Sequence, residues 1–428
     1  MVSPRIPYSV LLLCMALLAA CSEDSEWTGK VVDNVEVKLY TTGYEEDGDR
    51  SRMGNAEPWD ATRSWAPPTS PTKYVTYNEI YGANGMFANQ KNLVNKSISA
   101  FFTQNTETPQ TATFFFRNTD NTWQMRTDDE DGLENGTYYL YGFIPKEDAA
   151  SASIVSYNGT SANGDNSYNN GAVLTIHGLN ALTPSDVCVI VGAKDDPTWQ
   201  TSYDSDETEH TVTGLQAGHF DVSFQGGESA KNYLFLLFDH LYSAIRFQFT
   251  IDAKYAKLRT IRLRKLELVA YSDDHGGAVK AKYNATITLL KNNSGTSPIV
   301  GDVVFEPDNS SANVAPVPIY DWEDDLNNYV TLTDEPQQFM GCFVPGDHTY
   351  FKLRTTYDVF DKNTDSDPLG NLIRQQCQAE NTFDLRSKFD SYMSTVRGQR
   401  YSYTITVSPT YLYMLSEPDL DNPTLTIN

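Results

Sequence analysis

The sequence predicts an all-β protein built from two β-sandwiches in tandem. Apolar and polar residues alternate over many short segments rich in Tyr, Thr, Val and Phe, and this period of two is typical of strands with one buried face. Helical spacing of apolar residues is scarce and is clearest at residues 389–396, so we expect few, short helices. The 428 residues are 40% hydrophobic, enough for two to three domains of about 150 residues.

The first twenty residues are predicted to be a signal peptide. Arg5 precedes the apolar run Val10–Ala20, which is too short to cross a bilayer comfortably as a helix. Residues 18–21, LAAC, resemble a bacterial lipobox. This resemblance implies that Cys21 is acylated and becomes the mature N-terminus, since acyl chains contribute about 0.8 kcal/mol per buried methylene to membrane anchoring. The alternative is an ordinary secretory peptide with an incidental cysteine.

The composition is strongly acidic. With 32 Lys and Arg against 56 Asp and Glu, the formal net charge is −24. Such a charge excludes nucleic acid as a partner, because the phosphate backbone repels an acidic surface and no counterions are released. Residues 22–26, SEDSE, resemble the acidic stretch that directs Bacteroidetes lipoproteins to the outer face of the outer membrane. This resemblance implies a location at the cell surface. The alternative is that residues 22–26 are a solvated acidic linker.

The first predicted strand spans residues 31–40, where Val31, Val35, Val37 and Leu39 recur among polar partners. Further strands are predicted at Ser97–Phe102, Thr111–Arg117, Gly136–Ile144, Val173–His177, Val187–Ala193, Phe220–Phe224, Tyr233–Phe238, Ala244–Ile251, Leu258–Tyr271, Tyr283–Leu290, Val300–Phe305, Phe339–Val344, Phe351–Tyr357 and Tyr401–Val407.

Two features organise these strands. In Leu258–Tyr271 the apolar parity changes between Leu263 and Leu266, which predicts a β-bulge. The segment Gln225–Lys231, QGGESAK, is the best domain boundary, because it leaves two halves of about 200 residues with about seven strands each. We therefore expect a signal peptide at 1–20, an N-terminal segment at 21–63, a first sandwich at 64–228 and a second at 229–428.

Three cysteines follow Cys21. Because their number is odd, at least one remains a thiol or pairs between chains. Cys342 and Cys377 could form a disulfide in an oxidising envelope, and two buried thiols are the alternative. No CxxC pair or HExxH motif is present, and we expect no metal site. Asp361–Asp367 begins like a calcium loop but lacks its glycine and its final glutamate, which favours a solvated acidic turn.

No nucleophile elbow, P-loop or dinucleotide fingerprint occurs in the sequence. We therefore expect neither an enzyme nor a cofactor. The tryptophans could form a sugar-stacking platform, although core and loop anchors are favoured; they are Trp59, Trp65, Trp123, Trp199 and Trp322.

Two segments carry a family resemblance. Residues 238–247, FDHLYSAIRF, and residues 398–407, GQRYSYTITV, resemble signatures of the Bacteroidetes fimbrillins and fimbrillin-like proteins, the pilins of type V fimbriae. We call them the first and second motif. In the second motif every other residue from Tyr401 to Val407 shares one face of a strand, and Gly398 allows a tight turn before it. His240 in the first motif is predicted to be a core-edge residue bonded to the backbone.

The resemblance implies two transthyretin-like sandwiches and a removable first strand. In such lipoproteins an Arg-specific protease cuts behind the strand, and here the candidates are Arg63, Arg50 and Arg52. Three ordinary surface arginines are the alternative. Loss of the strand opens a groove for a donor strand from another pilin subunit, so the implied partners are pilins, the outer membrane through the lipid, and an unidentified host or bacterial surface ligand.

The C-terminal tail bears on the position within a filament. Leu425 and Ile427 alternate as in a strand, but residues 417–423, EPDLDNP, interrupt a continuous donor strand. This interruption favours a tip or accessory subunit, and packing of the tail on its own domain is the alternative. A second hypothesis for the whole chain is a glycan-binding outer-membrane lipoprotein of a nutrient-uptake system, which would share the lipobox, the acidity and the sandwiches.

Overall fold

The computed structural model describes residues 31–32, 35–41, 45–46, 72–73, 75–76, 96–408 and 425–427, apart from 106, 118–121, 129–131, 158–166, 196–210, 213–216, 226–230, 292–299, 323–328, 347, 363–369, 389–394 and 396. The signal peptide, Cys21 and the candidate processing sites Arg50, Arg52 and Arg63 lie outside the described residues. The helix predicted at 389–396 also falls outside them, apart from Thr395.

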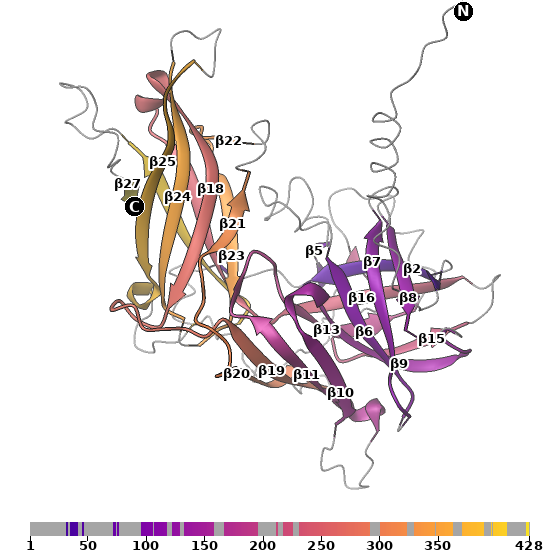
Figure 1. Ribbon diagram of the computed structural model, residues 1–428. Coiled ribbons are helices and arrows are strands. Elements are labelled where there is room, and N and C mark those ends of the chain that lie inside the picture. The colour runs from indigo at the N-terminus through magenta and orange to yellow at the C-terminus, as the bar shows by residue number, and fades with distance from the viewer. Residues whose placement is uncertain are drawn as a thin grey trace, which may run out of the picture.

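The described residues fold as strands, and four main sheets pack in pairs (Figure 1). Sheet 1 has the order β1-β8-β7-β6-β9-β13-β16-β2-β5, with β15 beside β9. Its strands are β1 (Val31–Val32), β2 (Val35–Thr41), β5 (Val75–Thr76), β6 (Ser97–Thr103), β7 (Gln110–Arg117), β8 (Thr122–Thr127), β9 (Gly136–Ile144), β13 (Cys188–Lys194), β15 (Asp221–Phe224) and β16 (Asn232–His240). Sheet 2 has the order β10 (Ser151–Ser156), β11 (Gly171–Asn180), β19 (Lys282–Leu290) and β20 (Val300–Pro307).

The second sandwich combines sheets 3 and 4. Sheet 3 has the order β12 (Leu182–Thr183), β23 (Gln337–Phe343), β17 (Ser243–Ile251), β26 (Gln399–Val407) and β27 (Leu425–Ile427), with β3 (Glu45–Glu46) also beside β26. Sheet 4 has the order β21 (Val317–Asp321), β18 (Arg259–Tyr271), β24 (Tyr350–Asp361) and β25 (Asn371–Asp384), with β22 (Val330–Thr331) beside β18. Separately, β4 (Thr72–Lys73) pairs with β14 (Thr211–Val212).

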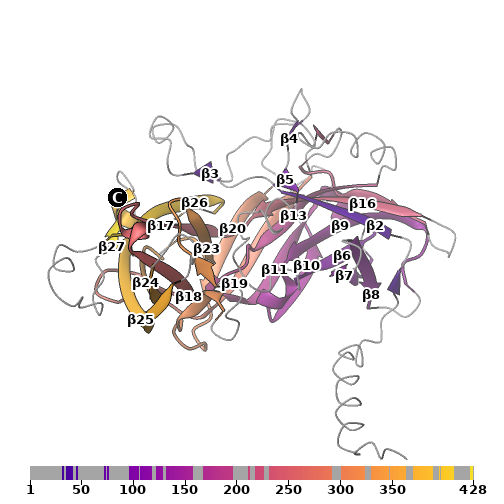
Figure 2. The same cartoon turned by 90° about the horizontal axis from the view of Figure 1, so that it is seen from above.

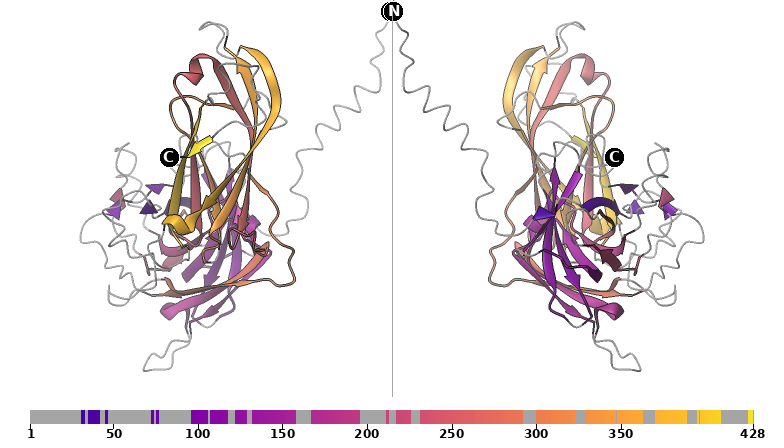
Figure 3. Two further views of the ribbon diagram at one scale, coloured as in Figure 1. Left: turned by 90° about the vertical axis from the view of Figure 1, so that its left-hand side faces the viewer. Right: turned by 90° about the vertical axis from the view of Figure 1, so that its right-hand side faces the viewer.

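Helical structure in the described part of the chain is limited to short 3₁₀ turns: η3 (Lys146–Asp148), η4 (Tyr168–Asn170), η6 (Tyr255–Lys257) and η8 (Leu385–Lys388). Among these residues no helix has the length and apolar character needed to span a bilayer. The all-β prediction is confirmed. In Figure 3 the orange and yellow strands of the second sandwich extend above the purple strands of the first.

Three apolar clusters hold this arrangement together. Core 1 lies between sheets 1 and 2 and includes Tyr141 from β9 and Ile287 from β19. Core 2 lies between sheets 3 and 4 and includes Phe247 from β17 and Phe351 from β24. Core 3 lies on the other face of sheet 1. Since β2 also lies against β8, at the far end of the strand order, sheet 1 curls around this third cluster.

The sheets cross the domain boundary predicted at residue 228. Strand β16 follows that boundary but pairs with β13 in sheet 1, and β19 pairs with β11 in sheet 2. Ala285, Ile287 and Leu289 thereby bury their side chains in core 1. The strands before and after Gln225–Lys231, β15 and β16, belong to the same sheet, so the polar composition of this segment did not indicate a change of domain.

The β-bulge predicted between Leu263 and Leu266 is confirmed. The register between β18 and β24 shifts between Leu263 and Lys265, so Arg264 is the extra residue. Its buried guanidinium donates from Nε to the Tyr329 hydroxyl over 2.8 Å, and Nη1 lies 3.5 Å from Asp358. The bulge therefore turns one arginine toward partners that a regular strand would not reach.

The structure contradicts the disulfide between Cys342 and Cys377, which carry thiols. The Cys342 side chain belongs to core 1, whereas Cys377 packs against core 2 from the edge strand β25. Side chains that face different cores cannot reach the short Cβ separation that a disulfide requires.

We expect the reactivity of each cysteine thiol to depend on how deeply its side chain is buried. In the folded protein iodoacetamide should label the half-buried Cys377, while the buried Cys342 and Cys188 should react only after unfolding. Burial and the neighbouring Asp186 also raise the pKa of the Cys188 thiol well above its usual range, which disfavours the reactive thiolate. Peptide mapping by mass spectrometry measures each site. Resistance of Cys342 and Cys377 in denaturant, reversed by a reductant, would instead reveal a disulfide.

Candidate functional site

The leading segment, residues 31–41, joins both edges of sheet 1. Its first part, β1, pairs antiparallel with β8, and its second part, β2, pairs in parallel with β16 from Val35 to Thr41. Figure 2 shows β2 running alongside β16. Without this segment β8 and β16 would each present an unpaired row of backbone groups.

Side chains of the segment also complete core 3. Val35 and Val37 are only 7% and 6% exposed, and they belong to the same cluster as Leu234 and Leu236 of β16. The backbone of Leu39 pairs with Leu236. The structure thus brings three of the four residues predicted for the first strand onto β16, while the fourth, Val31, pairs with β8.

The two motifs lie side by side, although they are far apart in the sequence. The first motif spans the end of β16, a short turn and the start of β17, so it carries the chain from the first sandwich into the second. The second motif forms β26, which pairs in parallel with β17 from Ala244 to Ile251. Gly398 has a φ of 73° in the turn before β26, and its N–H donates to the Tyr242 carbonyl over 2.8 Å.

A buried polar cluster lies beneath the first motif. His240 is fully buried, and its Nδ1 lies 2.9 Å from Asp186 Oδ2 and 3.4 Å from Cys188 Sγ. His240 therefore pairs with a carboxylate, where the sequence predicted a backbone partner. These atoms are close enough to bind one metal ion, but the contact with Asp186 already accounts for the imidazole nitrogen. The Asp-x-Cys pattern at 186–188 is too short a signal to have been recognised in the sequence.

An arginine joins this cluster to the second motif. Arg397 Nη1 donates to Asp239 Oδ2 over 2.8 Å and to the His240 carbonyl over 3.1 Å. Asp239 is fully buried and Arg397 nearly so. This ion pair therefore fixes the turn before β26 against the end of β16, at the point where the chain leaves the first sandwich.

The C-terminal segment lies in the second sandwich. Strand β27 pairs antiparallel with β26 between Ile405↔Ile427 and Val407↔Leu425. Strand β3, just after the leading segment, pairs with β26 at Gln399 and Arg400. The C-terminal strand and a short strand that follows the leading segment thus both pair with the strand that carries the second motif.

The remaining predicted features give weaker sites. Asp361, at the start of the predicted acidic turn, pairs with Arg259, with 2.7 Å between Oδ1 and Nη1. Residues 363–369 of that segment are outside the described residues. Trp322 packs against core 2 rather than forming a sugar platform. Trp59, Trp65 and Trp199 fall outside the part of the chain that the structure describes.

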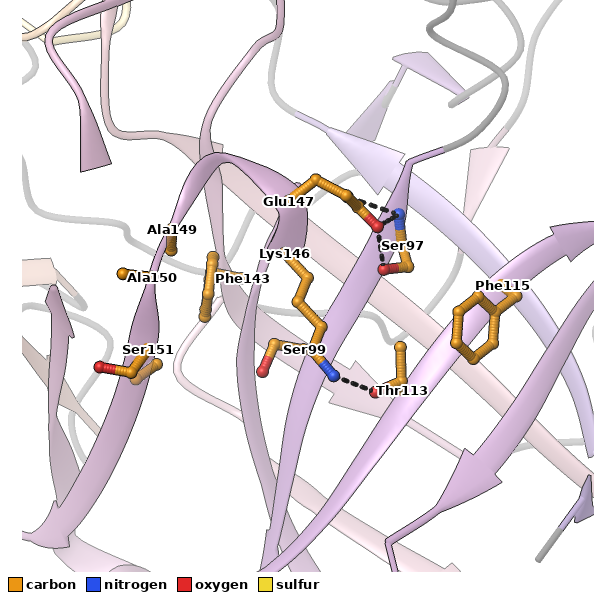
Figure 4. Close-up of a pocket in the computed structure, with 11 residues that line it drawn as sticks. Ser97, Ser99, Thr113, Phe115, Phe143, Lys146, Glu147, Ala149, Ala150 and Ser151 are labelled. Atoms are coloured by element: carbon orange, nitrogen blue, oxygen red, sulfur yellow. Dashed lines mark hydrogen bonds between the residues drawn. The ribbon is translucent and has the colours of Figure 1, made fainter. Parts of the chain in front are cut away.

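A pocket that the sequence did not indicate lies beside the edge strand β10 (Figure 4). It has a volume of about 340 Å³ and is lined by residues from β6, β7, β9, η3 and β10. Lys146 Nζ donates to Thr113 Oγ1 over 2.8 Å. Glu147 accepts hydrogen bonds from the Ser97 N–H, over 3.0 and 3.1 Å, and from its hydroxyl. Local sequence pattern could not predict this site, because its lining side chains come from four strands and a turn between residues 97 and 152 that only the folded sheets bring together.

Comparison with known proteins finds structural likeness only. No protein-family model matches this chain, and no curated protein does either. A candidate cell adhesion protein from Bacteroides fragilis is 11% identical, with 92% of this chain and 97% of that one covered and a TM-score of 0.35. A fimbrial protein from Bacteroides vulgatus is 12% identical, with 79% and 92% covered and a TM-score of 0.26. The tip fimbrial protein Mfa3 from Porphyromonas gingivalis is 9% identical, with 78% and 92% covered and a TM-score of 0.25.

Proposed function

We propose that this protein is a fimbrillin-like pilus subunit, structural and adhesive, anchored as a lipoprotein at the outer membrane before assembly. It acts without catalysis, by exchanging a strand with other pilin subunits. The observation that carries the proposal is the leading segment, which pairs with β8 on one side and β16 on the other and places Val35 and Val37 in core 3.

The physics of this segment supports strand exchange. An unpaired edge next to an apolar slot is a template for another strand. A covalently attached strand occupies the slot without the entropic penalty of association, so it keeps the precursor closed. Cleavage after Arg63, Arg50 or Arg52 removes that attachment, and the seven-residue β2 ladder can then give way to a donor strand from another subunit.

The placement of the C-terminal strand supports a tip or accessory position. Leu425–Ile427 pairs within the second sandwich, on β26, and this pairing competes with donation to another subunit. The subunit therefore receives a donor strand in the first sandwich more readily than it supplies one.

Controlled proteolysis tests the proposal. An Arg-specific endoprotease should cut the purified precursor to give a new N-terminus at Ser64, Ser51 or Met53. The cut segment should leave, and SDS-resistant species should form with other pilin subunits. Arg63→Ala, alone or with Arg50→Ala and Arg52→Ala, should abolish both effects, whereas Arg354→Ala on the exposed face of β24 should not.

Two observables decide the outcome. N-terminal sequencing identifies the cut, and electrophoresis without heating detects strand-exchanged complexes. A cut segment that stays bound, with no SDS-resistant species in the presence of other pilins, contradicts the proposal. So does an intact lipidated N-terminus on protein recovered from assembled fimbriae.

A further inference from the structure

The pocket of Figure 4 exists because sheet 2 ends at β10. That edge strand leaves part of the neighbouring face of β6 and β7 uncovered, and the pocket of about 340 Å³ occupies this space. Ser99 pairs with both Thr113 on β7 and Phe143 on β9, so the three side chains form a row across the pocket floor. The pocket floor is therefore part of a sheet, whereas Lys146 and Glu147 reach it from the turn η3.

The lining combines apolar and hydroxyl groups. Two phenyl rings, Phe115 and Phe143, and a short run of alanines supply the apolar surface. The hydroxyls come from Ser97, Ser99, Thr113 and Ser151. A pocket of this size with a few placed polar groups on an apolar surface suits a small, amphipathic ring. A pyranose is such a ring, with an apolar C–H face and hydroxyls at its edge.

The charges at the pocket set the class of ligand. The Lys146 ammonium is held over β7 by its hydrogen bond to the buried Thr113 hydroxyl, as Figure 4 shows. Arg126, on the neighbouring strand β8, does not line the pocket, but its guanidinium stands 5.2 Å from the centre of the Phe115 ring. The Glu147 carboxylate is turned to the start of β6, where it accepts from Ser97. One cation, Lys146, thus lies at the hydroxyl row, and the carboxylate of Glu147 is hydrogen-bonded to the protein itself.

We propose that this pocket binds the acidic sugar unit of a glycan. The sugar carboxylate pairs with Lys146, a ring hydroxyl bonds to the Ser99 hydroxyl, and the apolar ring face lies on Phe115. The buried Thr113 hydroxyl positions the ammonium. The proposal concerns a different surface from the leading segment, so it does not depend on strand exchange.

Binding to soluble oligosaccharides tests the site on the full, uncut chain. Isothermal titration should show saturable binding of 3′-sialyllactose or of a galacturonate trisaccharide, and at least about tenfold weaker binding of neutral lactose, because a charge-assisted hydrogen bond is lost. Lys146→Met should weaken binding of the acidic sugar by about tenfold or more. Thr113→Val, which removes the hydroxyl that positions the ammonium, should weaken it by a smaller factor.

A matched control separates the local contact from overall charge. Lys257→Met makes the same charge change at an exposed position on η6 of the second sandwich and should leave affinity unchanged. Equal melting temperatures for the three variants and the parent show that the fold is retained.

Three results would overturn the inference. The first is no binding of either acidic oligosaccharide at millimolar concentration. The second is equal affinity in Lys146→Met and in the parent. The third is binding of a short peptide with a free C-terminal carboxylate as tightly as the acidic sugars, which would assign the pocket to peptide capture. None of these results bears on the proteolysis assay, so the two proposals can fail separately.

Discussion

Substitution of Val37 by Asp should release the leading segment from the first sandwich. Val37 is 6% exposed within core 3, and its backbone pairs with Leu234 of β16. An unpaired carboxylate is not tolerated there, because burying an isolated charge costs far more than the segment gains from docking. The segment should therefore detach locally while the rest of the sandwich stays folded. Amide hydrogen exchange across residues 232–238 should accelerate by about tenfold or more.

A valine in the same sandwich provides the control. Val304 on β20 is 48% exposed, so Val304→Asp introduces the same charge at the surface and should change the free energy of unfolding by less than about 0.5 kcal/mol. Protection of the β16 amides that is equal in Val37→Asp and in the parent would show that the segment does not close sheet 1. The strand-exchange proposal would then lose its structural basis.

The second large effect is expected at the buried ion pair between the two motifs. Arg397→Met leaves the fully buried Asp239 carboxylate without its 2.8 Å guanidinium partner. Removal of one member of a buried pair lowers the free energy of unfolding by about 3–5 kcal/mol. Urea titration followed by tyrosine and tryptophan fluorescence measures the loss. We expect the first and second sandwiches to unfold separately in this variant, since the pair ties β16 to the turn before β26.

Two comparisons isolate the cause. Asp239→Asn combined with Arg397→Met removes both charges, and this double variant should recover much of the lost stability. The pair of Arg354 and Glu380 has a similar N–O distance of 3.0 Å, but its side chains are 50% and 41% exposed. Arg354→Met should therefore cost less than about 1 kcal/mol. An equal loss from Arg397→Met and Arg354→Met would contradict the role of burial.

Individual strands were predictable wherever burial imposes alternation. The predicted bounds Gly136–Ile144 are those of β9, and the parity change in β18 marked its bulge. In contrast β25 was missed, because this edge strand leaves both faces of Asn371–Asp384 largely exposed and its polar sequence carries no period of two. An edge strand such as β25 is stabilised mainly by backbone hydrogen bonds to its neighbour, here β24, rather than by burial of its own side chains.

The candidate site was predictable only in part, for a related reason. Alternation and the family resemblance predicted the leading strand. Its pairing partners, by contrast, are seen only in the folded sheet. Nothing local in the sequence relates Val35 to Asn232 or Val31 to Arg126, because register between distant strands is decided by which apolar faces pack together. The same holds for His240 on β16, whose partner Asp186 lies 54 residues earlier in the chain, just before β13, the strand that pairs with β16.

The passage from β16 into β17 has a mechanical consequence. The two strands are separated by only two residues, and each is a member of a different sandwich. The chain also passes between the sandwiches from β18 to β19 and from β20 to β21. Tension applied along the molecule would act at the β16–β17 crossing on the ladders of β17 with β23 and β26 lengthwise, so that many hydrogen bonds resist together rather than one after another. If the protein is the pilus subunit proposed above, it would in this way keep its two sandwiches aligned when it is pulled.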